Sequence, residues 1–213
     1  LVHECGHFFD TSQGGFSGAT YIFTSDLSFT CQGGSIPDFG GQTFARSLIK
    51  NDEYSSLHTP CAGWRDKNCD DTYAAIYLDG DPSNGQFESG DQGFDMLLEE
   101  TLQYINSLAT DYAFNDQLSW QGSARDGILT FLWYTERYLR MARLEHPGAY
   151  ELLSKNSCWR EVILNVWGRA WLFLEATKDI SKLGIQHTKL LGLVQAPELL
   201  EEIERLRQEE GCP

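Results

Sequence analysis

Apolar residues recur at helical spacing from Phe94 onward, and this periodicity limits the possible folds more than any other feature of the sequence. The pattern predicts a helix that runs from Phe94 to about Tyr112. Three further helices are expected over 125–145, 159–178 and 197–210. Pro147 and Gly148 are expected to close the first of these three, and Ser157 is a suitable N-cap for the second. The second half of the chain should therefore be almost purely helical.

The part of the chain before Phe94 has a mixed pattern. An opening helix is expected to end near Asp10, where the sequence TSQGG supplies helix breakers. Residues 19–30 are rich in Thr, Tyr, Ile and Phe and predict two short strands, and a short helix is expected at about 43–50. The polar, turn-rich segment 51–93 predicts an irregular insertion. The expected fold class is therefore α+β, mainly α.

Composition and charge exclude several classes of protein. With 213 residues, 41% of them hydrophobic, the chain can bury a sizeable core and should be globular. Its 31 acidic residues outnumber its 16 Lys and Arg residues, and a formal net charge of -15 would repel the phosphates of nucleic acids. The longest apolar stretch, 162–174, is too short to cross a bilayer and contains Arg169. We therefore expect no nucleic-acid partner and no membrane span.

Six cysteines are spread along the chain without the paired CxxC spacing of a zinc ribbon. They are Cys5, Cys31, Cys61, Cys69, Cys158 and Cys212. The even number and the acidic, aromatic-rich composition favour a secreted or extracytoplasmic location, with reduced thiols in the cytosol as the alternative. Cys61 and Cys69 are the pair best placed for a local disulfide, but the sequence leaves the pairing open. Because Leu1 is not an initiator methionine, we expect a fragment or a processed product.

The opening segment LVHECGHFFD contains the chemically most informative motif. On a helix, His3 and His7 lie one turn apart on the same face and can direct their imidazole nitrogens at one metal ion. Glu4, rotated by about 100° from His3, is close enough to act as a general base towards a water molecule at that ion. Two imidazoles and a carboxylate suit zinc. The motif therefore predicts a catalytic zinc helix that requires a third ligand elsewhere.

The combination of HECGH with the downstream segment LLEETLQYINSLA resembles the gluzincin branch of the zincin metallopeptidases, whose third zinc ligand is a glutamate on a separate helix. In gluzincin aminopeptidases this helix has the pattern Asn-Glu-Gly-x-x-x-Tyr. The segment matches this pattern at Glu99 and Tyr104 and departs from it at Leu98 and Glu100. The resemblance implies that Glu99 is the third ligand beside the two histidines, with Glu100 as the alternative.

The resemblance also implies supporting residues. Thermolysin-like members have an Asp four residues after the ligand, where it orients a histidine. Gln103 occupies that position, and its amide can also accept a hydrogen bond. Gluzincins commonly use a Tyr or His beyond the third ligand to stabilise the tetrahedral intermediate, and Tyr134 is the candidate for this role. A position in the aromatic core is the alternative for Tyr134.

Other side chains are weaker candidates. His58 and His187 could each be the third metal ligand or stabilise an oxyanion, although single histidines are more often surface or core residues. Cys5 is expected to form a structural disulfide or a buried thiol rather than to act as a nucleophile. A run of hard oxygen donors could bind Ca²⁺, although it fails the EF-hand pattern. These donors are Asp79, Asp81, Ser83, Asn84, Glu88 and Asp91.

Together, the motif and the resemblance predict a zincin-like metallopeptidase domain that hydrolyses a peptide or protein substrate with zinc and Glu4. Residues 1–115 would form the zinc-site region, with a loop-rich, disulfide-bearing insertion, and 116–213 a helical C-terminal subdomain. Because only Leu1 and Val2 precede the motif, we expect the upstream portion of the family's domain to be missing. The alternatives are a non-catalytic extracellular module whose metal site stabilises the fold, and a helical interaction protein with a chance motif.

Overall fold

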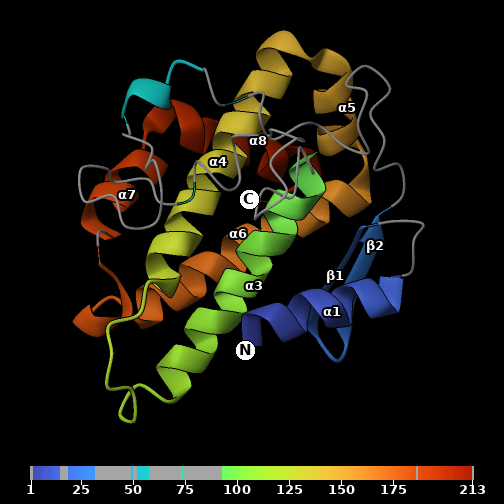
Figure 1. Cartoon of the computed structure of the whole chain (residues 1–213). Coiled ribbons are helices and arrows are strands. Elements are labelled where there is room, and N and C mark those ends of the chain that lie inside the picture. The colour runs from blue at the N-terminus through green and yellow to red at the C-terminus, as the bar shows by residue number, and fades with distance from the viewer. Residues whose placement is uncertain are drawn as a thin grey trace, which may run out of the picture.

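The computed structural model describes most of the helical second half of the chain and parts of the first half. The described residues are 2–14, 19–31, 49, 52–57, 73, 93–185 and 187–212. Within them the chain forms α-helices, a two-stranded sheet and short 3₁₀ turns (Figure 1). In chain order the elements are α1 (Val2–Gly14), β1 (Ala19–Thr24), β2 (Leu27–Cys31), η3 (Ser55–Leu57), α3 (Gly93–Ala113), α4 (Ala124–Glu145), α5 (Pro147–Lys155), α6 (Ser157–Ala176), η4 (Ser181–Leu183), α7 (His187–Val194) and α8 (Pro197–Glu210). The expected class, α+β and mainly α, is confirmed.

The long helices and the hairpin lie where the sequence predicts them. α3, α4 and α8 begin and end within one residue of the expected positions. β1 and β2 pair in antiparallel fashion over the range predicted for two strands, and β2 continues one residue beyond it to Cys31, which lies opposite Ala19. α1 continues to Gly14, beyond the end expected near Asp10. Asp10 is buried and hydrogen-bonded to Gln103 of α3, so tertiary contacts outweigh the helix breakers that follow it.

Of the two local predictions at helix ends, one was wrong and one is confirmed. The N-cap of α6 is Asn156 rather than Ser157, because the Asn156 side-chain oxygen accepts a hydrogen bond from the backbone N–H of Cys158 at 3.0 Å. α4 ends at Glu145, directly before His146 and Pro147, so the predicted end of this helix is confirmed. Pro147 then starts α5, since the first position of a helix needs no N–H donor. The sequence pattern did not predict the short helices α5 and α7, which lie on either side of α6 in the chain.

Helices α3, α4 and α6 pack together, and α1 lies across one side of α3 next to the hairpin (Figure 1). Among the described residues a hydrophobic cluster runs from β1 to α8, so it includes residues on both sides of the division expected at 115. Its largest fully buried side chains include Trp133 of α4 and Trp159 of α6. The surface of α3 that faces α1 therefore belongs to a rigidly packed helix.

A buried hydrogen bond and a disulfide are among the contacts that fix the β1–β2 hairpin to the helices. A two-stranded hairpin is only marginally stable by itself, so it depends on such attachments. Tyr21 of β1 is fully buried and donates a hydrogen bond to the backbone oxygen of Asp95 in α3 at 3.0 Å. Cys31 of β2 forms a disulfide with Cys158 of α6, across 127 positions of sequence. The sequence had left this pairing open.

Several expectations concern residues outside the described ranges. They are the helix at 43–50 apart from Ile49, most of the irregular segment 51–93, and the Cys61–Cys69 disulfide. Within the described part of the chain, no helix is both long and apolar enough to cross a membrane.

Glu136 is an acidic residue buried in the hydrophobic core. Its side chain on α4 is fully inaccessible, and within the described residues neither carboxyl oxygen has a hydrogen-bond partner. This burial raises the pKa of Glu136 from its ordinary value of 4.5 to about 10. The folded protein therefore holds a proton that the unfolded chain releases above pH 4.5, so the free energy of unfolding falls as the pH rises towards 10.

We expect Glu136→Gln to be more stable than the wild type at pH 7, by about 3 kcal/mol at 1.4 kcal/mol per pH unit. The glutamine amide matches the protonated carboxyl group in shape and cannot ionise. The gain should vanish near pH 4, where both folded and unfolded wild-type chains carry the proton. Urea unfolding at about pH 4, 7 and 9 measures it. A stability difference that stays constant across these pH values would contradict this account of Glu136.

Candidate metal centre

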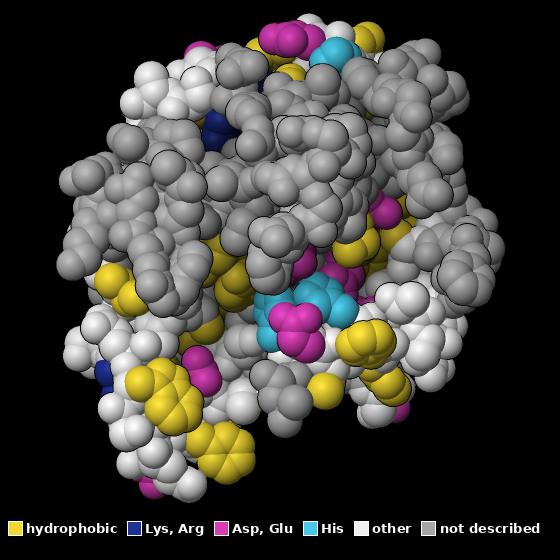
Figure 2. Space-filling model, viewed as in Figure 1, with side chains coloured by type: hydrophobic (Ala, Val, Ile, Leu, Met, Phe, Trp, Pro, Cys, Tyr) yellow, Lys and Arg dark blue, Asp and Glu magenta, His cyan; other side chains and the backbone are white. Residues whose placement is uncertain are grey.

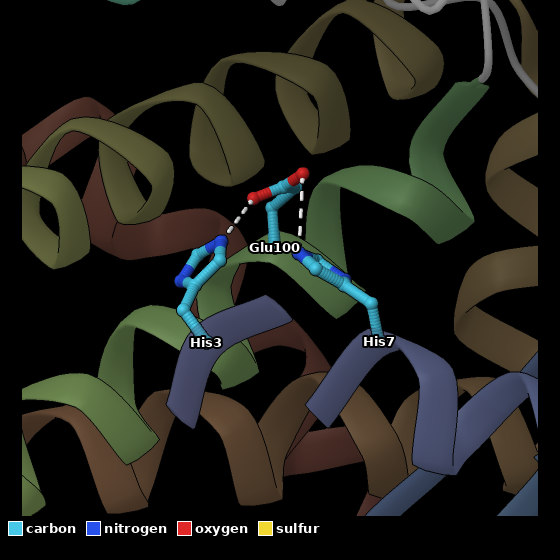
Figure 3. Close-up of side chains that lie close together, drawn as sticks. All are labelled: His3, His7 and Glu100. Carbon is cyan, nitrogen blue, oxygen red and sulfur yellow. Dashed lines mark hydrogen bonds and ion pairs between the residues drawn. The ribbon is translucent and has the colours of Figure 1, made fainter. Parts of the chain in front are cut away.

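Helix α1 brings its two histidines against a pair of adjacent glutamates on α3. His3 and His7 project from neighbouring turns of α1 towards Glu100 (Figure 3). The two histidine side chains are 17% and 22% exposed, so the cluster is partly open to solvent. The space-filling view shows histidine side chains at the surface beside acidic ones, with hydrophobic side chains on either side (Figure 2).

The spacing of the ligand atoms fits one small metal ion. His3 Nε2 lies 3.2 Å from Glu100 Oε2, and His7 Nε2 lies 3.6 Å from Glu100 Oε1. One ligand atom from each of the three residues can be chosen so that all lie within 4.8 Å of one another. Two ligands bound tetrahedrally at zinc distances are about 3.4 Å apart. The three residues can therefore share an ion with little movement.

Glu99 faces the other nitrogen of the His7 ring. Its carboxylate contacts His7 Nδ1, whereas Glu100 lies on the Nε2 side. A carboxylate only accepts hydrogen bonds, so this contact favours a proton on Nδ1 and leaves the Nε2 lone pair for an ion. Histidine ligands in metal sites usually donate their second N–H to such an acceptor. The geometry therefore favours Glu100 as the ligand and Glu99 as the residue that orients His7, whereas the sequence pattern favours Glu99 as the ligand.

The charges around His7 attract a cation. Burial of the ring opposes protonation, but the hydrogen bond to Glu99 and the negative charges of Glu99, Glu100 and Glu4 outweigh it and raise the pKa of His7 above its ordinary 6.5. A divalent ion would compete with a proton for the His7 ring, so metal binding should release protons at pH values where the ring is protonated.

A buried amide lies behind Glu99. Gln103 Nε2 donates hydrogen bonds to Glu99 Oε1 at 3.0 Å and to Asp10 Oδ2 at 3.1 Å. Burial, together with the charge of Glu99, raises the pKa of Asp10 to about 7, although hydrogen bonds from Ile22 and Gln103 oppose the increase. The resemblance to gluzincins predicts that Gln103 accepts a hydrogen bond from a ligating histidine. Its amide instead bridges two carboxylates.

Glu4 and Cys5 both lie on the exposed side of α1. Glu4 is solvent-exposed, and its charge reaches the His7 ring. Cys5 is exposed, and among the described residues it forms no disulfide, so the expectation of a structural disulfide or buried thiol was wrong. At about 100° per residue, Cys5 points away from the face that carries His3 and His7. Its side chain therefore lies outside the interface between α1 and α3.

Tyr134 lies in the aromatic core. It is fully buried, with its ring centroid 5.8 Å from that of Phe131 and 5.9 Å from that of Trp133. Phe131 stacks on Tyr104 at 5.3 Å, and the Tyr104 ring lies edge-on to His3 at 4.6 Å. Through these contacts Tyr134 is two rings away from His3. The arrangement matches the core alternative, and the role of Tyr134 in stabilising an intermediate stays a prediction.

The remaining candidates lie outside the described side chains. His58 belongs to a range that is not described, and the side chain of His187 at the start of α7 is not described either. The residues proposed as Ca²⁺ ligands also lie outside the described ranges: Asp79, Asp81, Ser83, Asn84, Glu88 and Asp91. Their roles stay predictions.

The sequence reading missed Asp10 and the orienting position of Glu99. Two spacings could have revealed them. Asp10 follows His7 by three residues, which places both on one face of α1, and Gln103 follows Glu99 by four residues on α3. Polar residues on the facing surfaces of two helices must satisfy one another once buried.

No protein-family model, curated protein or solved structure matches the chain. The function must therefore be inferred from the chemistry of the described residues.

Proposed function

We propose that the protein is a zinc-dependent peptidase whose metal ligands are His3, His7 and Glu100. One observation carries the proposal: the Nε2 atoms of two histidines four residues apart approach the Glu100 carboxylate at 3.2 and 3.6 Å. Ligands of a tetrahedral zinc ion have this spacing. The zincin-like character of the domain and the choice of zinc belong to the same proposal.

The chain's own residues supply the other parts of a hydrolytic site. Glu4 neighbours His3 in the sequence and is exposed, so its carboxylate can take a proton from water and return it to the leaving amine. Glu99 orients His7 through Nδ1. When bound, zinc would polarise the scissile carbonyl and make water a better nucleophile near neutral pH. The substrate class that suits this arrangement is a peptide or protein.

The exposure of the ligands favours a catalytic site over a structural one. Structural zinc sites are closed by four protein ligands, whereas catalytic sites keep one position open. Among the described residues the cluster offers three ligands, and its histidines are 17% and 22% exposed. The Cys31–Cys158 disulfide supports a secreted or extracytoplasmic location as part of the proposal.

The purified wild-type protein is expected to bind about one zinc ion per chain, as a single three-ligand site requires. Glu100→Gln should weaken zinc binding by about 100-fold or more because it removes a charged ligand. Glu99→Gln should weaken it by only about 10- to 100-fold, since it alters the orientation of one ligand. Competition with a chromophoric chelator measures all three affinities, and cleavage of a quenched-fluorescence peptide library measures activity.

The possible results separate the candidate functions. Zinc binding by the wild type with chelator-sensitive cleavage supports the peptidase. Zinc binding without cleavage of any peptide would favour a metal site that only stabilises the fold. If the wild-type protein binds no zinc, the peptidase and the fold-stabilising metal site are both rejected, and the histidine motif is a coincidence. Stronger dependence on Glu99 than on Glu100 would restore Glu99 as the third ligand.

A further inference from the structure

Gln103 is fully buried where α1 meets α3, and hydrogen bonds hold both ends of its amide. Its nitrogen donates to Glu99 and Asp10, and its oxygen accepts from Asn106 Nδ2 at 3.0 Å. The two N–H groups of an amide therefore each serve one carboxylate. Because Asn106 donates to the opposite end, the amide has one favourable orientation.

Gly6 provides the space for this amide. A Cβ atom at Gly6 would overlap the side-chain oxygen of Gln103. A long side chain can usually swing away from such a contact, but Gln103 is enclosed and its hydrogen bonds hold it in place. The glycine between His3 and His7 thus lets α1 approach α3 closely enough for Asp10 to reach the amide.

We infer that Gln103, anchored by Asp10, is a positioning residue that holds Glu99 against Nδ1 of His7. This inference rests on the proposed function, because it assumes a metal ion on the Nε2 side of His7. The single amide separates two carboxylates and satisfies one oxygen of each. The second oxygen of Glu99 then faces the imidazole. Without the amide, Glu99 loses the donor that fixes its rotamer, and His7 loses its fixed ring orientation.

A test of this role must separate positioning from simple packing. Co²⁺ is a suitable probe, because its visible absorption reports both affinity and ligand geometry without any need for activity. Gln103→Leu keeps most of the side-chain volume and removes the amide. We expect it to bind Co²⁺ about 10- to 100-fold more weakly than the wild type, with altered visible bands, as for other changes behind a metal ligand.

Thr135→Val is the matched control. Thr135 is also buried, and its hydroxyl donates to the backbone oxygen of Phe131 at 2.8 Å within α4. Thr135→Val removes a buried polar group, as Gln103→Leu does, but among the described residues the Thr135 hydroxyl is hydrogen-bonded within α4 and not to the metal cluster. We expect Thr135→Val to bind Co²⁺ with the wild-type affinity and spectrum.

Two more variants keep the test decisive if Gln103→Leu does not fold. Alanine ordinarily stabilises a helix relative to glycine, yet Gly6→Ala should weaken Co²⁺ binding because it displaces Gln103. Asp10→Asn keeps an acceptor for the amide and should retain the wild-type affinity. Wild-type affinity and spectrum in Gly6→Ala and Gln103→Leu would overturn the inference and leave the proposed metal site intact. If the wild-type protein binds no Co²⁺, both the inference about Gln103 and the proposed metal site are overturned.

Discussion

Replacing Glu4 with glutamine is expected to lower the rate of peptide cleavage by about 10²- to 10⁴-fold, the usual contribution of a general base. Glutamine has nearly the same shape as glutamate, but it cannot accept a proton from water at neutral pH. Glu4 is solvent-exposed on α1, so the change should leave the free energy of unfolding almost unaltered. Zinc binding should also stay close to the wild-type level, because Glu4 is not among the three proposed ligands.

Glu151→Gln provides the comparison for this measurement. Glu151 is an exposed glutamate on another helix, α5, and its replacement changes the net charge by the same amount. Rates should be measured on zinc-loaded proteins purified in parallel, so that a contaminating peptidase would appear equally in every sample. Equal cleavage by Glu4→Gln and the wild type would remove Glu4 from the mechanism. Loss of zinc from Glu4→Gln would instead make it a ligand.

Loss of the Cys31–Cys158 disulfide is expected to lower the free energy of unfolding by about 5 kcal/mol. The bond closes a loop across 127 positions, and a loop of this size strongly restricts the unfolded chain. Small domains have total stabilities of about 5–15 kcal/mol, so the double variant Cys31→Ala/Cys158→Ala should lie close to its unfolding limit. Guanidinium unfolding of the double variant and the wild type measures the difference.

Cys5→Ala is the control for this experiment. Cys5 is exposed, and within the described residues it forms no disulfide, so its removal should change the midpoint of unfolding very little. The double variant is preferable to chemical reduction, because a reducing agent would act on every cysteine pair in the chain. If the double variant and the wild type unfold at the same guanidinium concentration, the cross-link contributes nothing to stability, and the chain-entropy account is wrong here.

The sequence was sufficient for the long helices but not for the short ones. Burial of one face imposes its period on α3 and α8, so their bounds could be read from apolar spacing. α4 is buried on all sides over most of its length, and Pro147 and Gly148 mark its end in the sequence. α5 and α7 have 9 and 8 residues, which is too short for the period to be distinctive. The pairing of Cys31 with Cys158 depends on how the hairpin docks on α6, which no local pattern contains.

The candidate site was predictable to the level of a helix but not of a single residue. The spacing of His3 and His7 is a property of α1 alone, so the sequence was enough to bring them together. Glu99 and Glu100 are adjacent and differ by about 100° around α3, so their roles depend on how α1 lies across that helix. Gly6 and Asp10 set that arrangement by contacts with Gln103.

The disulfide has a topological consequence for proteolysis. His3 and His7 precede Cys31 in the chain, whereas Glu100 lies between Cys31 and Cys158. A single peptide-bond cut between residues 32 and 99 would produce two polypeptides that stay joined through sulfur. The fragment with both histidines could not diffuse away from the fragment with the glutamate. The nicked molecule would differ in mass from the intact one by a single water. Its two fragments would separate only after reduction of the disulfide.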